Sequence, residues 1–107
     1  TSYNQINGVP AADSYDMNTN IARGEWGFEG LIMTDWNGGV SHPSTSMHAG
    51  NDLIMPGSRE DVEEIIASVD AAEGTVKCPV KVEELRTCAE RVLRMIAKSN
   101  VCPGRSL

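Results

Sequence analysis

The sequence predicts an α/β fold with two short parallel strands and about three to four helices. Two short apolar runs, 31–34 and 52–55, are bounded by glycine or proline and show no alternation of apolar and polar residues. Such runs are typical of strands that are buried on both faces of a parallel sheet. The second half of the chain repeats its apolar residues at the helical period. Short strands and helices in this succession are typical of β/α units.

Size and composition restrict the classes of partner. A chain of 107 residues forms one small domain at most, or a piece of a larger one. With 40% hydrophobic and 22% charged residues it has a globular composition. The net charge of −6 argues against nucleic acid and anionic membranes, which attract clustered Lys and Arg. No apolar run approaches the ~20 residues that span a bilayer, so we expect neither partner.

The first quarter of the chain predicts a loop followed by a weak helix. Residues 1–16 are rich in Asn, Gly, Pro and Ser, and Asn7-Gly8 indicates a turn. Residues 16–25 have a weakly amphipathic pattern that ends at glycine. The start, Thr1–Tyr3, has no signal-peptide features and no strand or helix entry signal. We therefore expect the chain to be cut from something longer, and its compartment is left open.

The run 31–34 leads directly into Asp35 and Trp36, where the first predicted strand ends. The C-terminal ends of parallel strands are where β/α barrels place their catalytic groups, and a carboxylate beside an aromatic wall suits sugar chemistry. The competing interpretation is that Asp35 only caps the turn formed with the following Asn-Gly. A helical turn at 46–49 and the second strand, 52–55, follow.

Two clear helices are predicted in the second half. Ser58 and Asp61 have the spacing of a capping box, and the helix that they begin is expected to end at Gly74. A second helix is predicted over 82–98, after a break at Cys78-Pro79. Each has one apolar stripe for burial. The stripes comprise Val62, Ile65, Ile66 and Val69 in the first helix, and Leu85, Cys88, Ala89, Val92, Leu93 and Ile96 in the second.

These elements do not complete a fold by themselves. Two short strands cannot close a sheet, and two apolar stripes need a surface to lie against. The chain is therefore interpreted as a partial (β/α)8 barrel, that is, as consecutive units of an eight-fold barrel whose other units are absent from it.

Four motifs extend this interpretation to a family. The segments Thr1–Gly8, Arg23–Phe28, Gly30–Trp36 and Ala49–Gly57 occur in that order. Together they resemble the final third of the catalytic barrel of glycoside hydrolase family 3, the β-glucosidase and β-xylosidase type. The resemblance implies that residues 1–107 are a C-terminal fragment of that TIM-barrel-like domain. Its expected parts are a loop (1–16), a nucleophile-bearing β/α segment (17–57) and closing helices (58–100).

The resemblance also implies roles for three residues. Asp35 corresponds to the nucleophile, Trp36 to a wall of the subsite for the terminal sugar, and Tyr3 to a tyrosine close to the nucleophile. The implied activity is that of a retaining β-glycosidase, which forms a glycosyl-enzyme intermediate on Asp35 without a metal or cofactor. The family's general acid lies outside this stretch. We therefore expect the isolated chain to be inactive without the remainder of the barrel and an acid-bearing segment.

The remaining reactive side chains predict no further chemistry. Cys78, Cys88 and Cys102 match no zinc spacing and are interpreted as free thiols, with a Cys88–Cys102 disulfide left open. His42 and His48 are interpreted as loop histidines.

Three other acids have structural interpretations. Asp52 opens a strand at the structural face of a barrel, opposite the face that carries catalysis. Glu25 and Glu29 are expected to form salt bridges or to face solvent.

Two alternatives stay open at the level of function. The chain could be a non-enzymatic structural fragment. Its parent could instead have β-xylosidase or α-arabinofuranosidase specificity, because the residues that would distinguish a hexose from a pentose are largely outside the chain. An N-acetylglucosaminidase is disfavoured, because that branch of the family lacks the Asp-Trp context.

Overall fold

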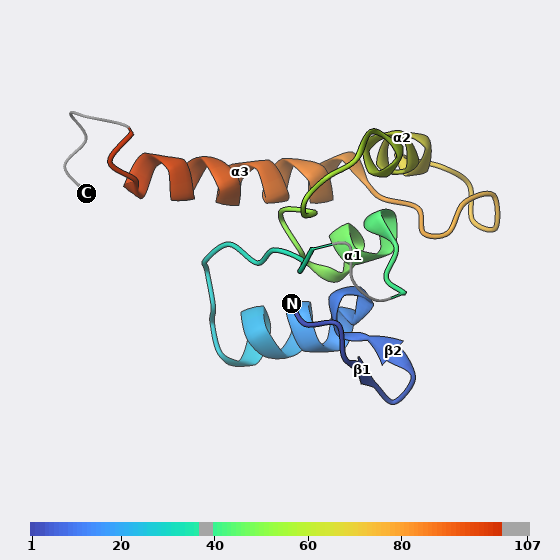
Figure 1. Cartoon of the computed structure of the whole chain (residues 1–107), viewed down its shortest axis with the longest axis horizontal. Coiled ribbons are helices and arrows are strands. Elements are labelled where there is room, and N and C mark those ends of the chain that lie inside the picture. The colour runs from blue at the N-terminus through green and yellow to red at the C-terminus, as the bar shows by residue number, and fades with distance from the viewer. Residues whose placement is uncertain (37–39, 102–107) are drawn as a thin grey trace.

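The computed structural model describes residues 1–36 and 40–101, which form an elongated body of 46 × 27 × 24 Å. Helix α1 lies at its centre and contacts α2, α3 and the N-terminal elements (Figure 1). The elements in chain order are β1 (Gln5–Ile6), β2 (Val9–Pro10), η1 (Ala11–Asp13), η2 (Asp16–Glu25), α1 (Pro43–Ala49), α2 (Arg59–Ser68) and α3 (Val82–Lys98).

The N-terminal range that was predicted to be a loop contains a small hairpin. Strands β1 and β2 pair antiparallel, with Ile6 opposite Val9. The turn between them has φ values of 51° at Asn7 and 80° at Gly8. Positive φ at both central residues is what a two-residue hairpin turn requires, and Asn-Gly adopts it readily. The predicted turn is therefore present, but it joins two strands that are too short to leave a periodic pattern.

The two predicted parallel strands are not confirmed. The segments 31–34 and 52–55 lie side by side but form only one isolated parallel bridge, between Met33 and Leu53. The sheet found within residues 1–36 and 40–101 is instead the antiparallel hairpin. A parallel ladder is stable when further strands continue it on both sides, and a lone pair has no such neighbours.

The first two larger helices lie close to their predicted positions. Helix η2 has the predicted bounds but is a π-helix, as the hydrogen bond from Trp26 N to Ile21 O (2.9 Å) illustrates. Helix α1 extends the predicted turn at 46–49 by three residues and ends at Ala49, where it is capped by Gly50, whose φ is 115°. A Cβ at Gly50 would lie 2.7 Å from Thr19 Oγ1, so only glycine fits there. Helices η2, α1, α2 and α3 agree with the predicted three to four.

Helix α2 begins as predicted and ends early. The capping box is present: Asp61 N donates to Ser58 Oγ (3.0 Å), and Ser58 N donates to Asp61 Oδ2 (2.8 Å). The helix ends at Ser68 and not near Gly74. The reason is that Val69 leaves the helix to form a parallel bridge with Val80.

The apolar stripes of the last two helices are more exposed than predicted. Exposure is 52% at Val62, 66% at Ile66 and 63% at Leu93. Two helices and two extended segments offer too little surface to cover both stripes. The buried interior is largely polar, with seven buried polar residues and four apolar ones in the described ranges: Asn18, Thr34, Ser44, Ser46, Asn51, Asp52 and Ser68, and Ala12, Ala49, Val80 and Cys88. None of the described helices is long and apolar enough to cross a membrane.

Candidate active site

Asp35 lies on the surface, directly after the segment that pairs with 52–55. Its Oδ1 accepts a hydrogen bond from Trp36 N at 2.8 Å. The bond is to the next residue, whereas a turn-capping aspartate bonds the backbone two residues on. The turn partners that the sequence predicted, Asn37 and Gly38, lie outside the described residues, so the capping interpretation stays a prediction. The bond from Trp36 N fixes the direction of the carboxylate, which a positioned nucleophile requires.

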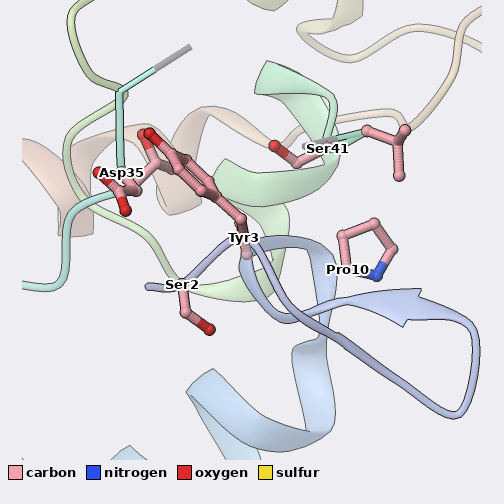
Figure 2. A pocket seen from close by; sticks show the side chains of 8 residues that line it. Ser2, Tyr3, Pro10, Asp35 and Ser41 are labelled. Atoms are coloured by element: carbon pink, nitrogen blue, oxygen red, sulfur yellow. The ribbon is translucent and has the colours of Figure 1, made fainter. Parts of the chain in front are cut away.

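The structure brings Tyr3 beside Asp35, although the two are far apart in sequence. Figure 2 shows the Tyr3 ring reaching towards Asp35, and the Tyr3 hydroxyl donates to the Trp36 carbonyl oxygen. Loss of hydration raises the pKa of Tyr3, and the negative charge of Asp35 and a hydrogen bond to it act in the same direction. The hydroxyl therefore remains protonated at neutral pH, where it can donate a hydrogen bond.

Tyr3 and Asp35 line one shallow pocket. Its cavity volume is ≈ 10 Å³, which is about the space for a single water molecule. A sugar ring does not fit in such a space. Trp36, the expected sugar wall, is 49% exposed and lies outside the pocket lining. The lining residues are Ser2, Tyr3, Pro10, Ala12, Thr34, Asp35, Val40 and Ser41.

Thr34 is a pocket residue that the sequence analysis did not identify. It is buried, and its Oγ1 accepts a hydrogen bond from Met55 N at 2.8 Å. Its own backbone N donates to Leu53 O at 3.0 Å. The signal in the sequence was a hydroxyl residue at the end of an apolar run, immediately before Asp35.

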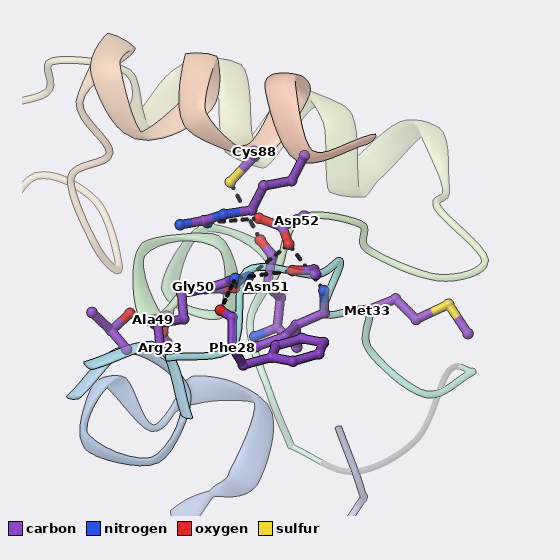
Figure 3. Close-up of polar contacts among 12 residues, drawn as sticks. Arg23, Phe28, Met33, Ala49, Gly50, Asn51, Asp52 and Cys88 are labelled. Carbon is purple, nitrogen blue, oxygen red and sulfur yellow. Dashed lines mark hydrogen bonds and ion pairs between the residues drawn. The ribbon is translucent and has the colours of Figure 1, made fainter. Parts of the chain in front are cut away.

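A buried ion network lies at the other end of the two extended segments. The Asp52 side chain is fully buried, as the structural interpretation of Asp52 implies. Oδ2 accepts from Arg23 Nη2 (2.7 Å) and Ile32 N (2.9 Å), and Oδ1 accepts from Arg91 Nη1 (2.9 Å) (Figure 3). The arginine partners were not predicted. Arg91 follows Cys88 by three residues, a spacing that places both on the inner side of α3.

The two histidines contact acidic side chains of other elements. His48 belongs to α1 and is not a loop histidine: its Nδ1 lies 2.7 Å from Glu84 Oε1 of α3. His42 precedes α1, and its backbone N donates to Asp13. Glu25 is exposed, as is Glu29. The described part of the chain contains no group of three His, Cys, Asp or Glu that could hold a metal.

Cys88 should be almost unreactive in the folded protein. It is buried beside Asn51 O (3.5 Å), and burial followed by the charge of Asp52 raises its pKa to about 11. Roughly one molecule in a thousand then carries the thiolate at pH 8. We expect iodoacetamide to label Cys88 at pH 8 only after unfolding, as followed by mass spectrometry. Rapid labelling of the native chain would contradict this. Cys78 is also free, whereas Cys102 and its possible disulfide lie outside the described residues.

Sequence and structure comparisons agree on the class of protein. A β-glucosidase of Rhizobium radiobacter is 38% identical over 99 residues, which are 92% of this chain and 11% of that protein. An exo-α-(1→6)-L-arabinopyranosidase of Bifidobacterium breve is 44% identical over 70 residues, or 64% of this chain and 9% of that protein. The crystal structure of a GH3 β-glucosidase of Bifidobacterium adolescentis superposes with a TM-score of 0.76 at 30% identity, covering 98% of this chain and 14% of that one. No family model matches the chain.

These similarities confirm the family resemblance that the four sequence motifs indicated. The chain belongs to glycoside hydrolase family 3 and corresponds to a segment of its β-glucosidases. It spans only about a tenth of the length of the relatives that it matches, 11% of the first and 9% of the second.

Proposed function

We propose that this segment carries the nucleophile of a retaining β-glycosidase that hydrolyses terminal β-linked glucosides. The main support is the pairing of Tyr3 with Asp35 at one pocket, in a chain that is similar to β-glucosidases over most of its length. A carboxylate that is oriented by a backbone N–H beside a protonated hydroxyl is suited to attack a sugar carbon and to hold the product of that attack.

In the proposed first step, the Asp35 carboxylate attacks the anomeric carbon and the bond to the leaving oxygen breaks. A carboxylic acid on another segment protonates that oxygen, and a glycosyl ester remains on Asp35. In the second step the same acid, now ionised, takes a proton from water, and the resulting attack releases the sugar and restores Asp35. In retaining glycosidases the nucleophile and the acid have their carboxyl groups ~5–5.5 Å apart. Tyr3 would donate a hydrogen bond near Asp35, and Trp36 would stack on the sugar.

The proposal requires protein beyond the described residues. The small pocket cannot enclose a pyranose, and the exposed stripes of α2 and α3 provide an apolar surface for the rest of a barrel. In this proposal residues 17–57 form the nucleophile-bearing segment and 58–100 the closing helices. The arabinopyranosidase relative supports a pentose as the second candidate for the sugar.

The stereochemistry of hydrolysis tests the proposal. In the full-length protein that carries this segment, we expect the first-formed sugar from an aryl β-glucoside to be the β-anomer, observed by ¹H NMR before mutarotation. The 107-residue chain should release no aryl alcohol in the same assay. An α-anomer as the first product would rule out a glycosyl ester on Asp35, and turnover by the 107-residue chain would rule out the need for a second segment.

A further inference from the structure

We infer that Thr34 is a positioning residue for Asp35. Its side chain takes the place of its backbone carbonyl as the last hydrogen-bond acceptor between the two parallel segments. It thereby sets where the backbone changes direction and how the Asp35 carboxylate is presented. This inference rests on the proposed role of Asp35. It concerns Thr34 itself, which no family resemblance singled out.

The hydrogen bonds around Thr34 show how the pairing ends. Asp52 N donates to Ile32 O (2.7 Å), and Thr34 N donates to Leu53 O (3.0 Å), on either side of the Met33–Leu53 bridge. A regular parallel ladder would continue with a bond to the Thr34 carbonyl oxygen from the backbone N two residues after Leu53.

That next backbone N belongs to Met55, and it donates to Thr34 Oγ1 at 2.8 Å instead. The hydroxyl thus satisfies the Met55 N–H while the Thr34 carbonyl leaves the ladder. The backbone is then free to change direction one residue later, at Asp35. Because Thr34 is only 6% exposed and lines the same pocket as Asp35, a shift of its backbone is passed directly to the carboxylate.

The side chain at this position therefore needs an acceptor atom as well as the right shape. Valine has the shape of threonine but cannot accept the Met55 hydrogen bond. In Thr34→Val, we expect Met55 N either to donate a hydrogen bond to the backbone carbonyl oxygen of residue 34 or to lose its partner. Either change moves Asp35. A displacement of about 1 Å at a reacting group can cost about 100-fold in rate. Serine keeps the acceptor and should keep the geometry.

The test measures chemistry on Asp35 in the full-length protein. The probe is 2,4-dinitrophenyl 2-deoxy-2-fluoro-β-glucoside: a bond forms between Asp35 and C1, the bond from C1 to dinitrophenolate breaks, and the anion leaves without a proton. The ester then hydrolyses slowly and can be located by peptide mass spectrometry. We expect Thr34→Val to slow the labelling at saturating probe by about 10- to 100-fold, with little change in the inhibition constant for glucose, and Thr34→Ser to react at close to the wild-type rate.

Controls separate positioning from general stability. Thr87→Val makes the same exchange at an exposed site on α3 and should leave labelling unchanged. Thermal unfolding reports whether each variant folds. If Thr34→Val does not fold, Thr34→Ala is compared with Thr34→Ser on the same probe.

Two outcomes would overturn the inference, and they are distinguishable. Labelling of Thr34→Val, or of a folded Thr34→Ala, at the wild-type rate would refute positioning by Thr34 while the nucleophile assignment stands. Absence of label from Asp35 in the wild-type protein would refute the proposed function itself, and the positioning role would fall with it.

Discussion

Replacing Asp35 with alanine is expected to lower kcat/KM for aryl β-glucosides in the full-length protein by about 10⁴-fold or more, the scale seen when a catalytic nucleophile is removed. The variant lacks the atom that would form the bond to C1. Neither Thr34 nor Tyr3 of the same pocket replaces it: the Thr34 hydroxyl is bonded to Met55, and Tyr3 is a phenol that stays protonated. The decrease should appear in kcat more than in KM, because the bond forms only during the chemical step.

External azide should restore part of the activity of Asp35→Ala. Azide can enter the space left by the carboxylate and attack C1 from the same side, so the product would be an α-glycosyl azide, identifiable by NMR. Glu29→Ala is the matched control, because Glu29 is an exposed carboxylate six residues upstream. Its activity should not change. Retention of most activity in Asp35→Ala would refute the nucleophile assignment.

The second large effect is expected at Asp52. Asp52→Asn should lower the free energy of unfolding by about 3–5 kcal/mol, the usual cost of removing one partner of a buried ion pair. The carboxylate accepts from Arg23, Arg91 and Ile32 N. An amide has one acceptor oxygen, and its NH₂ group would face a donor. The Nη atoms of Arg23 are well satisfied, but its buried Nε has no hydrogen-bond partner within the described residues, so loss of the carboxylate would add a second weakened donor to the same guanidinium.

The matched control for Asp52 is an exposed ion pair. Arg59 Nε lies 2.9 Å from Glu63 Oε1, and the two side chains are 87% and 62% exposed. Glu63→Ala should cost less than about 0.5 kcal/mol, because water screens that pair. Chemical denaturation of the full-length protein would measure both variants. Equal effects of Asp52→Asn and Glu63→Ala would show that the buried network does not stabilise the fold.

Local features of the fold could be predicted from the sequence because they depend on neighbouring residues. The capping box of Ser58 and Asp61 joins groups three residues apart, and the Asn7-Gly8 turn depends on the backbone preferences of two residues. The bounds of η2 also follow from local composition, although Gly24 lies inside the helix, which ends at Glu25, two residues before Gly27. Its π-type hydrogen bonding does not, since the same apolar residues suit an α-helix.

Predictions failed where distant segments compete with local preference. Residues 69–74 carry no strong helix stop before Gly74, yet the helix ends at Ser68 because Val69 pairs with Val80. The two parallel strands are not confirmed, for a different reason. The apolar runs are present and adjacent, but one pair without neighbouring strands forms a single bridge at Met33 and Leu53.

At the candidate site, the motifs and the family that they resemble single out Asp35, Trp36 and Tyr3, and the roles of these residues stay predictions. Tertiary structure decided how they are arranged: Tyr3, which precedes the hairpin, reaches the Trp36 carbonyl 33 residues away, and the buried Asp52 pairs with Arg23 and Arg91, which are 29 and 39 residues away. The physical reason is that capping and periodicity act between near neighbours, whereas ion pairing and hydrogen bonding in the interior depend on which groups folding removes from water together.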